Sequence, residues 1–248
     1  MKTPLLTWLK DQQEKLDMII KSSAEDFYNS NVDRENFEFD LQECQHESFN
    51  LVGGNDLCYD RPNTPFVYSM WYHARRINTF LSFFADTLLK NTSNDKIEIF
   101  DLGAGTGAVQ WSIALILCGM KALGIKTPKV TVINVDSSPF MLKYGKDFLW
   151  KHFLISYPEI SSLQFEARYS VNSWQNPDNV TLSNPWIVSS YLFDMSDNEE
   201  EIAKSFWELI DSFQPSQLLL ITSDQPKKKL FLSAIENTLR VCFGIIFY

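Results

Sequence analysis

The sequence is poor in the residues that build metal centres and disulfide frameworks. Its 248 residues include 4 Cys and 3 His. No two cysteines form a C-x-x-C pair, and the histidines lack the spacing of metal ligands. We therefore expect no metal site, and we expect the cysteines to be reduced thiols.

Long apolar runs are also missing. The longest, at 113–117 and 218–221, are far shorter than the roughly 20 residues that a membrane-spanning helix needs. Acidic residues at positions 11, 14 and 17 interrupt the N-terminal segment, which is unlike the apolar core of a signal peptide. These absences predict a cytoplasmic protein without a membrane partner.

Basic residues are outnumbered by acidic ones. The chain has 22 Lys and Arg against 31 Asp and Glu, a net charge of −9. Such a surface disfavours binding to a phosphate backbone, which relies on clustered cations. The two dense basic groups, at 75–76 and 227–229, are interpreted as solvated faces. We expect no nucleic-acid partner, and the sequence gives no oligomeric state.

What the sequence does have is a dense group of glycines at 97–107, I-E-I-F-D-L-G-A-G-T-G. A short apolar strand leads into Asp101, glycines follow at 103, 105 and 107, and helix-spaced apolar residues come next. Glycine allows positive φ and lets a ligand lie against bare backbone, and the helix N-terminus offers unpaired N–H groups. This stretch predicts a strand, a tight turn and a helix that together bind a nucleotide-like ligand.

Two ligand classes fit the glycines. Gly103, Gly105 and Ala108 match the G-x-G-x-x-[GA] pattern of dinucleotide-binding proteins. Asp101 favours the other class, because a carboxylate would repel a pyrophosphate but pair with an ammonium group. With Asp101 included, D-x-G-x-G-x-G resembles motif I of the class I S-adenosylmethionine-dependent methyltransferases. The resemblance implies that Asp101, Gly103, Ala104, Gly105 and Gly107 surround the amino-acid part of the cofactor. A glycine turn without a ligand is the remaining alternative.

The alternation of strands and helices predicts the fold class. Strands are expected at 129–135, 163–171, 185–194, 217–222 and 241–248, with helices at 139–157, 197–213 and 228–240. This order predicts an α/β, doubly wound Rossmann-like sheet with helices on both faces, as the resemblance to class I methyltransferases also implies. That family usually adds a seventh strand, so either this sheet ends early or the sequence is truncated.

The N-terminal third is expected to form a helical extension. One long helix is predicted from Thr3 to Asn29 and another at 66–89, separated by a polar loop at 31–63 with one short helix at most. A loop of that length is a candidate substrate lid. We therefore divide the chain into a helical extension or lid at 1–92 and a methyltransferase domain at 93–248.

An acid also ends the second expected strand. Asp136 could accept two hydrogen bonds from ribose hydroxyls, and Ser137 follows it in the predicted cofactor site. The alternative role for Asp136 is helix capping, because Ser137, Ser138 and Pro139 open the next helix. Asn172, just past the third strand, matches the family's adenine-binding place by position only.

The expected reaction centre lies at the end of the fourth strand, because ligands bind outside the carboxyl ends of parallel strands. Ser189 is assigned to the cofactor site there. Tyr191, Asp194 or His73 could serve as a general base if the acceptor is protonated. Tyr72 lies in the helix before the sheet, which in methyltransferase-like proteins often covers the cofactor, so it joins the cofactor set.

A fainter similarity concerns the mitoribosomal small-subunit assembly family of methyltransferase-like proteins. It rests on G-A-G-T-G-A followed by Trp111, on S-S-P-F-M-L-K-Y-G at 137–145 and on S-S-Y-L-F-D at 189–194. The metal-binding cysteines of that family have no counterpart here, and the acidic charge argues against ribosomal RNA. We treat it as a distant relative.

The sequence as a whole predicts an enzyme, an S-adenosylmethionine-dependent methyltransferase. Its acceptor is unknown, with a small molecule preferred over protein or RNA. Two other functions stay open: an NAD-dependent oxidoreductase, and a catalytically silent adaptor that binds S-adenosylmethionine.

Overall fold

A computed structural model describes residues 2–50, 57–91, 96–175, 182, 185–190, 199–222 and 242–247 of the chain. Contacts divide it into two compact units. The helical unit comprises Met1–Asp95, Gly105–Lys129 and Ser138–Phe165, and the sheet unit comprises Lys96–Ala104, Val130–Ser137 and Glu166–Tyr248. The division that we expected after residue 92 stays a prediction.

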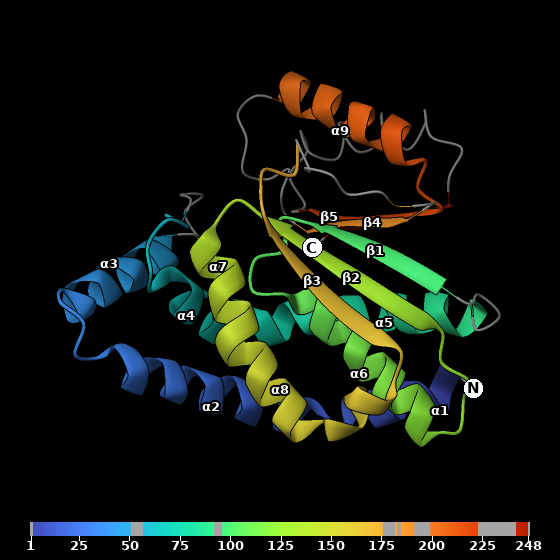
Figure 1. The fold of residues 1–248 in the computed structure, drawn as a ribbon, viewed down its shortest axis with the longest axis horizontal. Helices are drawn as coiled ribbons and strands as arrows, with labels where there is room; N and C mark the ends of the chain where they lie inside the picture. Colours follow the sequence, from blue (N-terminus) through green and yellow to red (C-terminus); the bar gives the residue numbers. More distant parts are fainter. Residues whose placement is uncertain are drawn as a thin grey trace. The chain divides into compact units, whose positions relative to one another are not determined.

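The sheet unit contains six strands in the order β3-β2-β1-β4-β5-β6. Their bounds are β1 Lys96–Leu102, β2 Lys129–Asp136, β3 Phe165–Val171, β4 Trp186–Ser190, β5 Gln217–Thr222 and β6 Cys242–Phe247 (Figure 1). The pairs β1–β4, β4–β5 and β5–β6 are parallel. This order is that of a doubly wound sheet, and it confirms the fold class. The helix expected at 228–240 lies outside the described residues.

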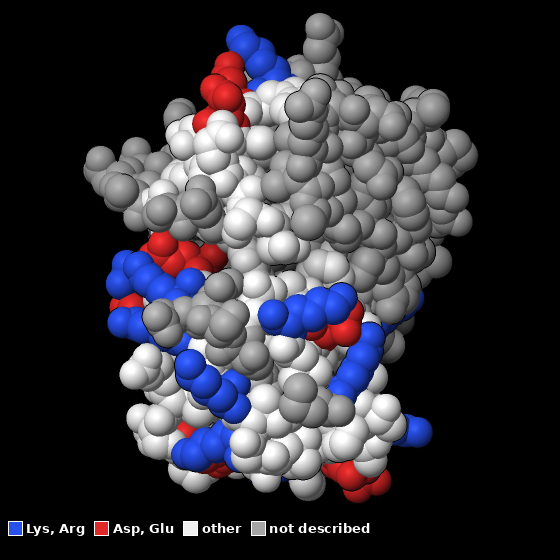
Figure 2. All heavy atoms as spheres, turned by 90° about the vertical axis from the view of Figure 1, so that its right-hand side faces the viewer, with Lys and Arg blue, Asp and Glu red and all other residues white. Residues whose placement is uncertain are grey.

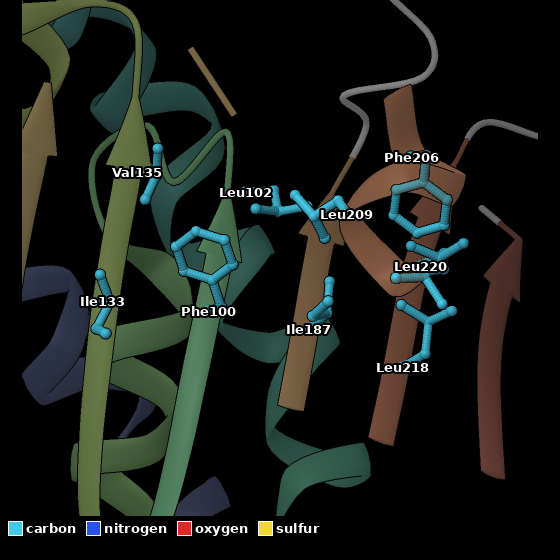
Figure 3. Packing of buried hydrophobic residues seen from close by; sticks show 10 residues of the cluster. Phe100, Leu102, Ile133, Val135, Ile187, Phe206, Leu209, Leu218 and Leu220 are labelled. Atoms are coloured by element: carbon cyan, nitrogen blue, oxygen red, sulfur yellow. The ribbon is translucent and has the colours of Figure 1, made fainter. Parts of the chain in front are cut away.

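One face of this sheet is covered by α9, Glu199–Phe213. Phe206, Leu209 and Ile210 of α9 are buried and follow the spacing of an amphipathic helix. They pack against alternate residues of the strands, which point to the same side (Figure 3): Phe100, Leu102, Ile133, Val135, Ile187, Leu218 and Leu220. Because side chains alternate along a strand, Asp101 leaves the opposite face from its neighbours Phe100 and Leu102.

The helical unit is built around α6, Ala108–Ala122, in which every residue from 108 to 120 is buried. The other α-helices described in this unit are α1 Lys2–Lys10, α2 Gln13–Asn31, α3 Phe37–Asn50, α4 Thr64–Tyr68, α5 Ala74–Lys90, α7 Pro139–Tyr144 and α8 Lys151–Ser156. Helix α1 approaches so closely that a Cβ on Gly119 would lie 2.6 Å from the Trp8 ring. Helix α5 is tied to α6 because the Ser112 hydroxyl donates to the Ile77 carbonyl at 3.2 Å.

Three of the described segments of this unit depart from α-helical geometry. A π-helical segment, η2 at Ser69–His73, joins α4 to α5, and a second, η3 at Gly145–Trp150, joins α7 to α8. A short 3₁₀ helix, η4 at Pro158–Ser162, precedes β3. The helices expected at 66–89 and 139–157 are therefore confirmed, each with a π-helical insertion that apolar spacing does not indicate.

Two N-terminal predictions differ from the structure. The helix expected from Thr3 to Asn29 is two helices, α1 and α2, and nothing in the apolar spacing marks the break between them. The stretch read mainly as loop contains the 14-residue helix α3. It was missed because its buried stripe consists of only Phe37, Leu41, Cys44 and Ser48 among polar residues.

Among the residues that the structure describes, no helix is both long enough and apolar enough to cross a membrane.

Candidate functional site

The glycine turn after β1 has the backbone that its sequence predicts. Gly103, Gly105 and Gly107 have φ of 67°, 55° and 85°, the left-handed region in which a side chain would be strained. Gly107 is the N-cap of α6, so the first N–H groups of this 15-residue helix follow the turn directly. The Ala104 N–H donates to the Val135 carbonyl at 2.9 Å, which fixes the start of the turn to β2.

Asp101 is a buried acidic residue of the sheet unit. Only 2% of its surface is exposed, and its Oδ2 atom has no hydrogen-bond partner among the described residues. Burial raises the pKa of its carboxyl well above the ordinary value, and the nearby Asp136 carboxylate raises the pKa further. Native proteins rarely leave a buried carboxyl oxygen unpaired. A cation at this position would supply the missing partner and reverse the pKa shift.

The carboxyl ends of β1, β2 and β3 meet at one edge of the sheet. The Asn172 N–H, just after β3, donates to the Asp136 carbonyl at 3.0 Å, as Ala104 does to Val135. Asp101, Asp136 and Asn172 are thus brought together, which is where a doubly wound sheet binds its ligands. The Asn172 side chain donates to the Ser170 hydroxyl at 3.2 Å. Ser137 is exposed, next to the half-buried Asp136.

The structure also decides which residue caps α7. The Ser138 hydroxyl accepts a hydrogen bond from the Met141 N–H at 3.2 Å and is the N-cap of the helix. Capping was the alternative role considered for Asp136. Because Ser138 is the N-cap of α7, helix capping does not explain why an acid stands at position 136.

The end of β4 is described only in part. Ser189 pairs in register with Leu102 of β1, so its side chain shares the α9 face and leaves the sheet opposite Asp101. Its hydroxyl is buried without a partner among the described residues. A ligand beside Asp101 could therefore contact Ser189 only through the Ser189 backbone. Tyr191 and Asp194, two of the three predicted bases, lie outside the described residues.

Two predicted residues belong to the helical unit. His73 is fully buried, and its Nδ1 atom lies 2.9 Å from the Thr106 hydroxyl in the glycine turn. Burial lowers the pKa of its imidazole to about 3, so His73 is neutral near physiological pH. Tyr72 is half-buried, with its ring 5.2 Å from that of Tyr68. Thr106 was not predicted, although its place between two glycines marks it as part of the turn.

Basic side chains of the helical unit lie beside acidic ones. Lys2 and Lys90 both pair with Asp86, at 3.1 and 2.8 Å. Figure 2 shows Lys and Arg next to Asp and Glu at several places on one face. Mixed charge of this kind is typical of a solvated surface. The absence of a nucleic-acid partner stays a prediction.

No family model and no curated protein matches the sequence. Among solved structures, the chain is similar to a candidate S-adenosyl-L-methionine-dependent methyltransferase from Methanococcus maripaludis, at a TM-score of 0.41 and 15% identity over 74% of each chain. It is also similar to the plantazolicin methyltransferase BpumL in complex with SAH, at a TM-score of 0.32 and 15% identity over 83% of this chain and 58% of that one. Similarity at these scores assigns no activity, so function has to be judged from the residues of this chain.

Proposed function

We propose that this chain binds S-adenosylmethionine and transfers its methyl group. The observation that carries the proposal is the buried Asp101 carboxyl oxygen that lacks a partner, two residues before a left-handed glycine turn. S-Adenosylmethionine carries an ammonium group that would pair with this carboxylate, and its nucleoside is the kind of ligand for which such a turn leaves room.

The residues at the sheet edge fit the parts of this cofactor. Asp101 would hold the ammonium group, and the turn from Gly103 through Ala104 to Gly107 would pass close to the amino-acid part. Asp136 would accept hydrogen bonds from the ribose hydroxyls. Ser137 and Asn172 would lie toward the adenine, while contacts from Tyr72 and from the Ser189 backbone are further proposals.

The same edge fits a dinucleotide less well. A pyrophosphate carries negative charge, and the Asp136 carboxylate already disfavours ionisation of Asp101 by raising its pKa. Adding a pyrophosphate would increase this repulsion, whereas an ammonium group would relieve it. The electrostatics of the site therefore favour a cationic ligand over NAD.

When bound, S-adenosylmethionine supplies a methyl carbon that is already activated for displacement, so the protein has mainly to position the acceptor. Asp101 and the glycine turn would fix the cofactor. Asp194 or Tyr191 would accept the proton of a protonated acceptor. His73 is poorly suited to that task, because its imidazole is fully buried and its pKa is about 3.

A small molecule is the acceptor that we propose, because the net charge of −9 disfavours RNA. Transfer of labelled methyl groups from S-adenosylmethionine to small molecules, proteins and RNA would test this. Cofactor binding without transfer to any of the three would instead favour the silent adaptor.

A thermal-shift comparison tests the cofactor first. At 100 times its dissociation constant, a ligand adds about 2.7 kcal/mol of stability. For a chain of this size, that gain corresponds to a rise in Tm of about 5 to 10 °C. We expect S-adenosylhomocysteine (SAH) to produce such a rise and NAD to produce none. A rise with NAD and none with SAH would refute the proposal and favour the oxidoreductase.

A further inference from the structure

Thr106 is held from two sides within the helical unit. It lies between Gly105 and Gly107, two residues with positive φ. Because glycines restrict the backbone little, the contacts of Thr106 have a large influence on the conformation of the turn. Its side chain lies 2.9 Å from His73 Nδ1. Its backbone packs against Gly145 so closely that a Cβ there would lie 2.7 Å from the Thr106 carbonyl oxygen.

Both contacts come from π-helical segments. His73 is the last residue of η2, and Gly145 is the first residue of η3. Segment η2 is also joined to the residue that precedes η3, because the Ser69 hydroxyl donates to the hydroxyl of Tyr144, the last residue of α7, at 3.1 Å. π-Helical turns are rare and occur frequently at functional sites. Here two of them converge on one residue of the glycine turn.

The π-helical geometry determines which residues of η2 face inward. Ser69 and His73, at its two ends, are buried, whereas Met70 and Trp71 between them are 50% and 60% exposed. The His73 ring also meets the Trp111 ring of α6 edge to face, with centroids 4.8 Å apart. His73 is thereby fixed in one orientation, with Nδ1 toward Thr106. Its Nε2 atom is buried and has no partner among the described residues.

We infer that His73 is a positioning residue that acts through Thr106 to hold the glycine turn in the conformation that receives the cofactor. His73 acts through its contact with the Thr106 hydroxyl, and His73 itself touches neither cofactor nor acceptor. The inference rests on the proposed function for the identity of the ligand, but the effect on the turn itself does not depend on any ligand.

Four variants separate this role from that of a general base. His73→Phe and Thr106→Val each remove the hydrogen bond, whereas Thr106→Ser keeps it. His73→Asn places an amide near the position of Nδ1, so it keeps the bond to Thr106 but lacks any base at Nε2. Ser112→Ala is the matched control, because it removes a fully buried hydroxyl that bonds to the Ile77 and Ala108 carbonyls but leaves the contact between His73 and Thr106 intact.

The first measurement is hydrogen exchange of the amides at 103–107 in the protein without ligand. Loss of a buried hydrogen bond is expected to raise their exchange rate about tenfold in His73→Phe and Thr106→Val. Exchange in Thr106→Ser, His73→Asn and Ser112→Ala should stay within about twofold of the wild type. Unchanged exchange in both His73→Phe and Thr106→Val would overturn the inference even if the protein binds no SAH.

The second measurement is SAH affinity by calorimetry, with circular dichroism to verify folding. We expect about tenfold weaker binding in His73→Phe and Thr106→Val, no further loss in the double variant, and near-normal affinity and turnover in His73→Asn. Faster exchange in the turn with normal SAH affinity in His73→Phe and Thr106→Val would overturn the positioning role. Normal affinity with lost turnover in His73→Asn would also overturn it, because that result is expected of a general base. Absence of SAH binding in the wild type would count against the proposed function alone.

Discussion

The Asp101 carboxylate is expected to lower the stability of the ligand-free protein and to strengthen cofactor binding. Asp101→Asn should therefore raise the free energy of unfolding and weaken SAH binding. Burial and the neighbouring Asp136 carboxylate raise the pKa of Asp101 in the folded protein. A carboxyl with a raised pKa stabilises the fold fully only while it is protonated. Stability is therefore lost as the pH rises from the unfolded pKa, about 3.9, through the folded pKa. Asparagine has nearly the same shape without the charge, so the variant avoids this loss.

The expected gain in stability follows from the environment of the carboxyl. Asparagine also leaves a buried polar group at this position, so the gain comes only from the absence of a charge; a difference of one pKa unit between the folded and unfolded states corresponds to about 1.4 kcal/mol. We therefore expect Asp101→Asn to raise the free energy of unfolding of the ligand-free protein by about 1–3 kcal/mol near neutral pH. The difference from the wild type should shrink as the pH falls toward the unfolded pKa, because the wild-type carboxyl then becomes neutral too.

The expected effect on binding has the opposite sign. A hydrogen bond to a charged group contributes about 1.5–3 kcal/mol, so SAH should bind about 10 to 150 times more weakly to Asp101→Asn. The nucleoside 5′-methylthioadenosine lacks the amino-acid part of SAH, and its affinity should change little. Asp136→Asn is the matched control, because loss of a ribose partner should weaken both ligands.

Urea unfolding at several pH values and calorimetry with the two nucleosides measure these effects. A variant that is less stable than the wild type and binds SAH equally well would show that Asp101 is a structural residue and does not bind the cofactor. Equal weakening of SAH and 5′-methylthioadenosine would place Asp101 near the nucleoside rather than the ammonium group.

Two further substitutions test the packing that supports the site. Gly145→Ala should lower the free energy of unfolding by about 1–3 kcal/mol, because its Cβ would lie 2.7 Å from backbone of Thr106 that cannot easily move; a wild-type urea midpoint would contradict this packing. Phe206→Ala should cost about 3–5 kcal/mol, because Phe206 is fully buried between α9 and the strands; a loss below 1 kcal/mol in the same assay would show that α9 does not cover this face.

The sheet and the turn were predictable because their signals are local. The apolar strand before Asp101, the glycines at 103–107 and the apolar run at 129–135 each indicate their element without knowledge of the others. The alternation of strands and helices then indicates a doubly wound sheet. For the same reason, Asp101 and Asp136 could be assigned to one edge of the sheet before any coordinates were known.

The role of His73 could not be predicted in this way. Its neighbour Thr106 lies 33 residues further along the chain, and the π-helical turn that directs it inward has no periodic signal in the sequence. A histidine among aromatic residues was therefore interpreted as a possible base, whereas its burial and its contact with Thr106 favour a positioning role. Gly145 was missed for a similar reason, because only the packing of η3 on the turn requires a glycine there.

The two acids at the sheet edge explain why the site favours one ligand charge. Asp101 and Asp136 raise the free energy of the ligand-free site, since like charges oppose one another and Asp101 is also desolvated. A protein selected for stability alone would replace Asp101 with a neutral residue, as Asp101→Asn should demonstrate. An acid at position 101 is consistent with a ligand whose positive charge lowers the free energy of the site on binding. The stability that Asp101 costs the ligand-free protein then contributes to the affinity for that ligand.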